Sequence, residues 1–416
     1  MIRTLAALLA AASCIPMAQA REPVTTVADT TLTLDDAVIA AGGSAPAAQA
    51  AQAGIDAARA ARTVAGLRPN PAIQAQVENV AGSGPYGGFD SAESTVSLAM
   101  PIELGRKRSA RIAVADAQAS RALLTAAIAQ ADIRLQVTQL YVEAVAAERR
   151  LGTARDQARI AADAAHAAMI RVQAGRASPI EQQRADVARI NADAAVERAS
   201  RLTDAARANL MRRVGRSGPL DLGWLDRLPG QGPEVPASAA GTLALVAADA
   251  DLAIADAGVG LARSQRVPDL EVGPGVRRLS QTGDTALVFS LSMPIPLFNS
   301  GRAAVAQAHA QRAQADAQKR LTALDIEQAI TDAQAEAANA AITARATAGP
   351  ALAAAQEAAR IARIGYREGK FGQLDLLDAE RTLADTRIAA IDALAAYHNA
   401  RAQLERLTTP APQQGN

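Results

Sequence analysis

The longest pattern in the chain is a heptad of small and apolar residues that begins at Ile133. Its steps alternate between four and three residues, which is the spacing of a helix with one continuous packed seam. The helix can run from about Gly105 to about Gln173, and at 1.5 Å per residue it would be roughly 100 Å long. The seam positions are Ile133, Val137, Leu140, Ala144, Ala147, Leu151, Ala154, Ala158, Ala161, Ala165, Ala168 and Val172.

A second seam of the same spacing lies in the second half of the chain. Ser97 aligns with Ser290, 193 residues later, and Gly175 aligns with Gly369, 194 residues later. A period this long indicates an internal duplication and not a short solenoid repeat. Pro350 interrupts the second seam and predicts a kink there. The second seam is expected at Ile326, Ile330, Ala333, Ala337, Ala340, Ala344, Thr347, Ala351, Ala354, Ala358, Ile361 and Gly365.

Each long helix is expected to turn back, so that each half contains a helical hairpin. Gly175 can end the first long helix in a left-handed conformation. Ser178 then reads as an N-cap, and Glu181 three residues later would close a capping box. Gly372 and Asp375 take the same two places in the second half. The returning helices would run to about 214 and 407, and shorter helices over about 45–67 and 243–265 would lie end to end with them.

Four strands are expected, two in each half. Loops rich in Gly, Ser and Asp separate the members of each pair, so each pair reads as a hairpin. Two hairpins alone would leave open edges, which several chains could close into a barrel. Each strand has the length that a tilted membrane strand needs. The strands are expected at Ile73–Val80, Ser94–Ile102, Asp269–Leu279 and Thr285–Ile295.

Composition narrows the architecture. Half of the 416 residues are apolar but only 2% are aromatic, and alanine dominates. Large compact cores are built from bigger side chains, so close helix–helix contacts are favoured over a globular core. The net charge of +1 argues against a nucleic-acid partner.

The N-terminus reads as an export signal. Arg3 precedes the apolar stretch Leu5–Ala12, and Ala18-Gln19-Ala20 forms an A-x-A cleavage site. No other apolar run approaches the ~20 residues of a spanning helix. Cys14, the only cysteine, lies inside this signal, and two outcomes stay open for it: removal with the signal, or lipidation in an imperfect lipidation sequence.

The chain resembles the TolC-like outer-membrane efflux family. Two pairs of segments carry the resemblance: the strand-to-helix junctions SLAMPIELGRKRSAR and SLSMPIPLFNSGRAAVAQA, and the hairpin tips AGRASPIEQQRAD and EGKFGQLDLLDAERTLAD. The resemblance implies an α+β membrane protein: a homotrimer with long periplasmic helical hairpins forming an α-barrel, and a β-barrel to which each chain gives four strands. LRPNPAIQAQVENVAGSG and PIELGRKRSAR resemble the heavy-metal branch, the outer component of cobalt–zinc–cadmium exporters.

The implied function is the outer-membrane channel of a tripartite efflux system. Its expected partners are a periplasmic adaptor (membrane fusion) protein, an inner-membrane pump of the resistance-nodulation-division type, and outer-membrane lipid. The cargo would be divalent heavy-metal cations; drugs or secreted proteins are the alternative. A periplasmic coiled-coil scaffold or adaptor is the alternative of another class, and it would leave the four strands unexplained.

The expected organisation follows the duplication. Residues 1–20 form the signal peptide, 21–219 the first half of the repeat, 220–240 a linker, 241–409 the second half, and 410–416 a disordered tail.

Two aspartates are the candidate pore constriction. Asp375 and Asp378 are three residues apart near the start of a helix, so they share one face. The family pattern implies two acidic rings lining the periplasmic mouth. The alternative for Asp375 is that it only stabilises the helix N-terminus. Glu181 and Arg184 stand at the equivalent first-half positions, so one hairpin per chain would carry the acidic pair.

The hairpin tips are the candidate adaptor contacts, although their glycines also have a purely structural use as helix caps. No metal site or cofactor is expected, because the three histidines have no partner histidine at helical spacing. No nucleophile–base pair or phosphate loop appears, so an enzyme is the least favoured class. The tip residues are Gly175, Arg176, Ser178, Gly369, Lys370 and Gly372.

Overall fold

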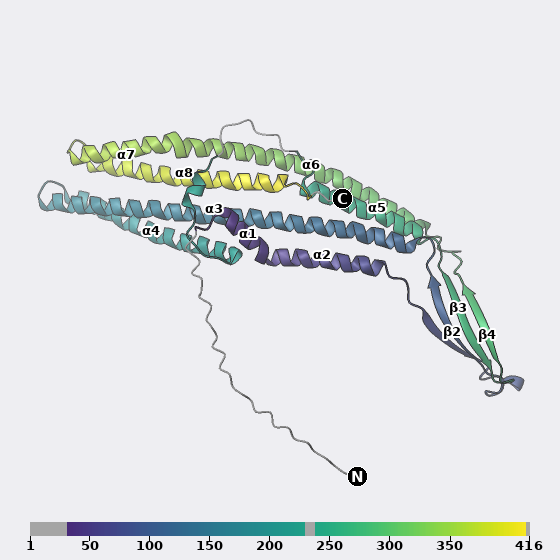
Figure 1. Cartoon of the computed structure of the whole chain (residues 1–416). Helices are drawn as coiled ribbons and strands as arrows, with labels where there is room; N and C mark the ends of the chain where they lie inside the picture. The colour runs from purple at the N-terminus through teal and green to yellow at the C-terminus, as the bar shows by residue number, and fades with distance from the viewer. Residues whose placement is uncertain (1–30, 229–237, 413–416) are drawn as a thin grey trace, which may run out of the picture.

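The computed structural model describes residues 31–228 and 238–412. It is an elongated layer of helices with a narrow β-sheet at one end (Figure 1). In chain order the elements are α1 (Leu34–Ser44), α2 (Pro46–Ala65), β1 (Ala72–Glu78), the 3-10 turn η1 (Gly84–Tyr86), β2 (Glu93–Ile102), α3 (Lys107–Gln173), α4 (Pro179–Val214), the 3-10 turn η2 (Leu222–Asp226), α5 (Leu243–Ser264), β3 (Leu270–Leu279), β4 (Thr285–Ser292), α6 (Arg302–Ala346), the π-helical segment η3 (Thr347–Ala351), α7 (Leu352–Arg367) and α8 (Gln373–Thr408).

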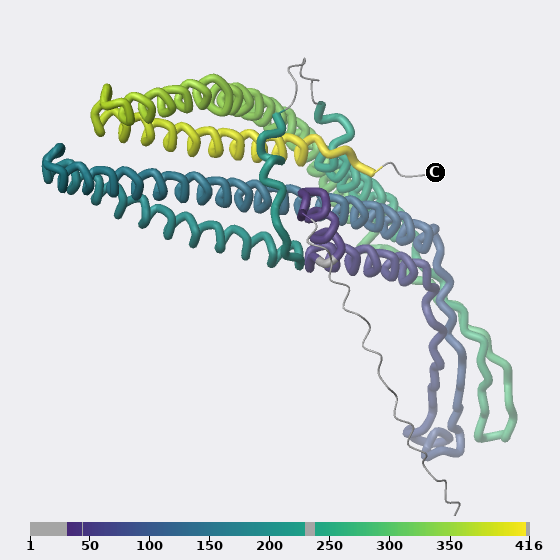
Figure 2. Tube along the Cα trace, turned by 60° about the vertical axis from the view of Figure 1, so that its left-hand side comes forward, coloured from purple at the N-terminus to yellow at the C-terminus, as the bar shows by residue number. Residues whose placement is uncertain are grey.

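The helices form one curved layer in a fixed order (Figure 2). α2 and α4 lie end to end along one side of α3, and α5 and α8 lie end to end along its other side. α6 and α7 pack on the far side of α5 and α8. The layer therefore has two unpartnered edges, one made by α2 and α4 and the other by α6 and α7. The expected end-to-end stacking of the shorter helices is confirmed.

The four expected strands are present and form one antiparallel sheet in the order β1-β2-β3-β4. The register pairs Ile73 with Leu98, Val96 with Val276, and Val276 with Leu287. Because alternate side chains lie on opposite faces, these residues share one apolar face. The opposite face is polar: Arg277 pairs there with Glu93 (2.7 Å) and with Glu78. The apolar face also includes Ile73, Val77, Met100, Ile102, Val272, Phe289 and Leu291.

The seam predicted for α3 is buried or half-buried at all twelve positions. The seam predicted for the second half fails beyond η3, where Ala354 and Ala358 are exposed while Ala355 and Ala359 are buried. The cause is η3, since a π-helical turn accommodates one extra residue and rotates everything after it. One residue is also the difference between the two alignment offsets, 193 and 194. The interruption expected at Pro350 is thus a π-helical insertion, with a non-helical backbone at Gly349.

The basic residues at the start of α3 cap the C-terminal end of α2. Arg108 Nε donates to the Gly66 carbonyl at 2.5 Å, and Arg111 Nη2 donates to the Leu67 carbonyl at 3.1 Å. Arg111 also forms a two-pronged ion pair with Glu103, which lowers the pKa of that carboxyl. Cations are favoured at a helix C-terminus because the last carbonyls there lack helical partners. The segment GRKRSAR therefore links the start of α3 both to the end of α2 and to the residues that follow β2.

The sequence did not predict α1 or η2. Both belong to a small cluster that crosses α3 and α8. The Trp224 ring stacks on His398 with ring centres 4.2 Å apart, and it meets Tyr141 edge-on. Tyr141 Oη donates to the Leu32 carbonyl at 2.9 Å, and Leu225 is 0% exposed. Residues 220–228, expected as a plain linker, therefore pack across α3 and α8. We call this segment the strap.

The buried ring of His398 is expected to make residues 220–228 sensitive to pH. Its Nε2 donates to the Leu225 carbonyl at 2.9 Å, and burial lowers the pKa of the ring. Below the ordinary histidine pKa near 6.5 the unfolded chain takes up a proton first, so the free energy of unfolding falls as pH falls. We expect the opening constant of residues 222–228, which is amide exchange divided by its intrinsic rate at each pH, to rise by up to about tenfold for each pH unit of decrease just below that point.

Two variants check this expectation by hydrogen exchange. His398→Gln, which can keep a donor but does not titrate, should remove the pH dependence. The exposed His166→Gln should leave it intact. Equal pH dependence in wild type and His398→Gln would show that another group is responsible.

The expectation that no run is apolar enough to cross a membrane is wrong for α3. Among the described helices, α3 alone has a window with a mean hydropathy of 1.2, which passes a test by length and composition. α3 packs on α2, α4, α5 and α8 along its length, but only 11% of this window is buried within the single chain.

Several expectations fall outside the described residues. The signal peptide and Cys14 precede residue 31, and part of the linker (229–237) and the last four residues are likewise not described. Residues 410–412 differ from the expected disordered tail. Pro410 pairs with Thr242, and the Ala411 amide donates to the Gly241 carbonyl at 2.9 Å.

Candidate functional site

The two hairpin tips lie at the end of the layer opposite the sheet (Figure 1). At the first tip Gly175 has φ +66°, a left-handed conformation that glycine adopts without strain. The Gly175 amide donates to Val172 at 2.9 Å and the Arg176 amide to Arg171 at 2.8 Å. These two bonds are a Schellman motif, which satisfies the last carbonyls of α3.

The second tip has the same geometry. Gly369 has φ +70°, its amide donates to Tyr366 at 3.1 Å, and the Lys370 amide donates to Gly365 at 2.8 Å. The Phe371 ring then packs directly over Gly365, where an added Cβ would lie 2.1 Å from a ring carbon. The glycine caps expected from the sequence are therefore present at both tips, and both tips are exposed.

The helices that leave the tips begin differently from each other. Ser178 is the N-cap of α4 as expected, but the predicted capping box does not form. Glu181 instead faces Arg171, with 3.6 Å between its Oε1 and the Arg171 Nη1. In the second hairpin the Asp375 carboxylate accepts the Gly372 amide at 2.9 Å, so Asp375 does stabilise the start of α8.

Asp378 has no such local use. Within the described residues its exposed carboxylate makes no hydrogen bond or ion pair. It lies on the face of α8 opposite the buried Leu376, Glu380 and Leu383. Asp375 lies on the same exposed side, so the tip presents two neighbouring carboxylates away from the rest of the chain.

The second hairpin is tied to α3 by polar contacts near the tips. Arg171 Nη1 donates to Tyr366 Oη at 3.1 Å, and its guanidinium lies 5.6 Å from the centre of that ring. Further from the tip, Gln157 donates to the Glu380 carbonyl at 3.2 Å. A cleft of 520 Å³ runs between α3 and the second hairpin beside these contacts. Near the tips the two hairpins are therefore held together mainly by polar side chains, whereas an apolar core joins α3 to α8 further from the tips.

Glu380 is the most buried charge in this region and was not singled out from the sequence. It is 2% exposed and accepts two hydrogen bonds from Arg363, one of them at 2.7 Å. The carboxylate holds the pKa of Arg363 above its ordinary value. A buried carboxylate inside the Asp-rich stretch at the start of α8 gives no signal in the sequence that sets it apart from its exposed neighbours.

Replacing both Gly175 and Gly369 with valine is expected to distort the tips and weaken adaptor docking. Both sites are open around the Cβ position, so the strain comes from the left-handed backbone alone. That conformation costs an ordinary residue about 1–2 kcal/mol. Crosslinking to the adaptor from cysteine placed at Arg176 measures docking. Asparagine at the same two glycines, which tolerates this backbone, is the matched control. Unchanged crosslinking in the valine variant would leave the glycines as helix caps only.

In the described part of the chain no group of three or more His, Cys, Asp or Glu side chains is arranged to hold a metal ion. His166, His309 and His398 lie on three different helices, and His398 is engaged with the strap. What the geometry provides is a long wall of helices that carries exposed carboxylates at one end and a sheet with one apolar face at the other.

This arrangement defines a class, the TolC-like outer-membrane channels. The outer-membrane channel MtrE of Neisseria gonorrhoeae, in its open state, superposes with a TM-score of 0.73 over 90% of this chain and 88% of its own, at 22% identity. The profile of the outer membrane efflux protein family matches residues 40–216 and 237–409. The chain belongs to the outer membrane efflux protein family.

Two relatives are closer in sequence. The cobalt-zinc-cadmium resistance protein CzcC of Cupriavidus metallidurans is 32% identical over 381 residues, which are 90% of each chain. The nickel and cobalt resistance protein CnrC of the same organism is 32% identical over 65% of each chain. The resemblance stated from the sequence is confirmed, and the protein is an outer-membrane efflux protein with a large periplasmic helical part.

Proposed function

We propose that this protein is the outer-membrane duct through which a tripartite system expels divalent heavy-metal cations. The observation that carries the cargo is the 32% identity to the cobalt-zinc-cadmium resistance protein over 90% of both chains. The described residues offer no cluster for holding a metal ion. The duct would therefore pass the cation without binding it tightly, and the choice of ion would be made by the pump and adaptor.

We propose that the working unit is a homotrimer with an internally duplicated protomer. The sheet order β1-β2-β3-β4 leaves the outer edges of β1 and β4 unpaired, and the helical layer also has two open edges. The two layers run in the same order, since β1 follows α2 and β4 leads into α6. One rotation between copies would close both layers together. Twelve strands would then form a barrel whose apolar face meets lipid.

We propose that the tips dock a periplasmic adaptor and that Asp375 and Asp378 line the entrance. The support is positional: both tips lie at the end farthest from the sheet, and the Asp378 carboxylate is exposed and unpaired within the described chain. Three copies would bring six carboxylates around one axis. Rings of acidic side chains attract cations into a pore.

A deletion strain tests the cargo. Sensitivity would be measured one metal at a time, with cobalt, zinc, cadmium, nickel and copper, against a set of organic antibiotics. The proposal expects hypersensitivity to divalent metals and restoration by the wild-type gene. Hypersensitivity to antibiotics alone would move the cargo to drugs. Native mass spectrometry in detergent tests the trimer separately, and a stable monomer or dimer would exclude the shared barrel.

A further inference from the structure

The exposed surface of α6 carries a run of unpaired acids, of which Asp325, Asp332 and Glu336 share one face. Between Arg320 and Arg345 the sequence has four carboxylates and no Lys or Arg. All four side chains are exposed, and none of them has an ion pair or hydrogen bond among the described residues. The exposed Leu324 and Ile342 lie before and after the run, while Ile326 and Ile330 face into the chain. The four are Asp325, Glu327, Asp332 and Glu336.

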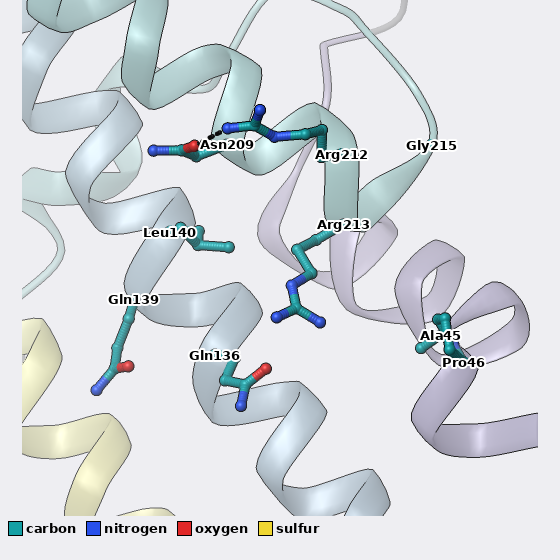
Figure 3. Close-up of a pocket in the computed structure, with 9 residues that line it drawn as sticks. All are labelled: Ala45, Pro46, Gln136, Gln139, Leu140, Asn209, Arg212, Arg213 and Gly215. Carbon is teal, nitrogen blue, oxygen red and sulfur yellow. Dashed lines mark hydrogen bonds between the residues drawn. The ribbon is translucent and has the colours of Figure 1, made fainter. Parts of the chain in front are cut away.

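The end of α4, on the opposite open edge, is basic. Arg213 has no ion pair or hydrogen bond within the described chain, and Arg212 donates only to the Asn209 side chain. The two arginines line a groove of 720 Å³ together with the polar side chains of Gln136 and Gln139. Figure 3 shows the Arg213 guanidinium pointing into this groove toward Gln136, with Arg212 on its rim. The groove therefore offers two guanidinium groups that have no acidic partner among the described residues.

The acidic run and the basic groove lie at the same height along the helix axes, measured from the sheet toward the tips. Arg406 on α8 pairs with Asp132 on α3 at 2.5 Å. Leu404 and Leu407, beside it on α8, pack against Ile326 and Ile330 on α6. Residue 132 of α3 therefore lies level with residues 326–330 of α6. Both helices run from the sheet toward the tips, so Asp332 and Glu336 lie level with the stretch of α3 that borders the groove.

We infer that Asp332 and Glu336 of one copy pair with Arg212 and Arg213 of the next copy, completing the groove. The inference rests on the proposed homotrimer and adds which surfaces meet and in which register. Copies related by rotation about an axis along the helices keep their level, so one copy's α6 edge meets the next copy's α4 edge at matching heights. Facing charges of opposite sign fix that register and exclude sliding by a turn.

Alanine lets the two helices approach. Ala205 and Ala208, with the exposed Leu202, lie on the open side of α4. Leu324, Ala335 and Ile342 lie on the face of α6 away from its buried residues. Helices packed through small side chains can lie at the short end of the usual 8–10 Å range. At that distance the long arginine side chains can span from one helix to the carboxylates of the other.

Charge exchange tests the pairing. Asp332→Arg with Glu336→Arg, or Arg212→Glu with Arg213→Glu, should raise the concentration at which the trimer dissociates in detergent by at least about tenfold. Combining all four changes should restore it to within about threefold of wild type, because the pairs are then reversed but intact. Asp163→Arg with Asp385→Arg, at exposed carboxylates on α3 and α8, which have helices on both sides, is the matched control and should be neutral.

A crosslink tests the same contact without reversing any charge pair. Asp332→Cys with Arg212→Cys, in a chain whose Cys14 is serine, should form disulfide-linked multimers on mild oxidation. α4 and α6 do not pack on each other within the chain, so such a bond must join two copies. Glu357→Cys with Arg212→Cys, nearer the tip on α7, should not crosslink. A wild-type protein that is not trimeric overturns the homotrimer. A trimer that forms no crosslink and ignores both reversals overturns this pairing alone.

Discussion

Alanine at both Asp375 and Asp378 is expected to relieve block of the channel by multivalent cations, raising the blocking concentration at least about tenfold. The expected cause is the loss of six carboxylates around the proposed entrance, where a narrow axis would concentrate their field. The trimer should persist, because neither side chain packs in the interior of the chain. Planar-bilayer recordings with added divalent and trivalent cations measure the block.

Single substitutions separate the helix-capping role seen for Asp375 from the proposed pore-lining role. Asp375 accepts the Gly372 amide at 2.9 Å, so Asp375→Ala should also cost the start of α8 about 1 kcal/mol. Asp378 has no local partner among the described residues, so Asp378→Ala should alter block without changing stability. Asp163→Ala, at an exposed carboxylate on α3, is the control and should leave block unchanged. A double variant blocked at the wild-type concentration would leave Asp375 as a helix cap and exclude the acidic ring at this site.

The sequence predicted most of this fold because long helices repeat their packing signal many times. Twelve positions of α3 carry the same signal, and all twelve are at least half-buried. The strands were also legible, because alternation and turn residues mark each hairpin. The second seam failed where one residue was added. A heptad pattern drawn straight through Gly349 has no means of detecting a π-helical insertion, except through the change in offset from 193 to 194.

The strap and the ties between hairpins were missed for a different reason. Trp224, His398 and Tyr141 are far apart in sequence, and none of them belongs to a periodic pattern. Arg171 and Tyr366 likewise meet only because two hairpins lie side by side. Glu181 illustrates competition between local and distant partners, since Arg171 draws it away from the capping box that its spacing predicts. Contacts of this kind form only when the helices pack side by side, so no pattern in the neighbouring sequence predicts them.

The junction between β2 and α3 at Gly105 has no room for a side chain. Gly105 has φ +68°, and an added Cβ would lie 2.6 Å from the Val267 Cβ and 2.8 Å from the Ser264 carbonyl. The same junction is held by Asp269, which pairs with Lys107 at 2.7 Å and accepts the Leu104 amide at 3.1 Å. A side chain at residue 105 would therefore push β2 and α3 away from the end of α5.

Gly105→Ala is expected to destabilise the protein by about 2–5 kcal/mol, from left-handed backbone strain together with overpacking. Gly283→Ala is the matched control: φ there is +75° but the Cβ position is open, so only the backbone cost remains. The difference between the two variants isolates the crowding at the junction. Thermal unfolding of the detergent-solubilised protein, followed by far-ultraviolet circular dichroism, measures both. Equal midpoints for the two variants would mean that the junction yields to the extra methyl group, and that β2 and α3 are not held against α5 as closely as Val267 and Ser264 indicate.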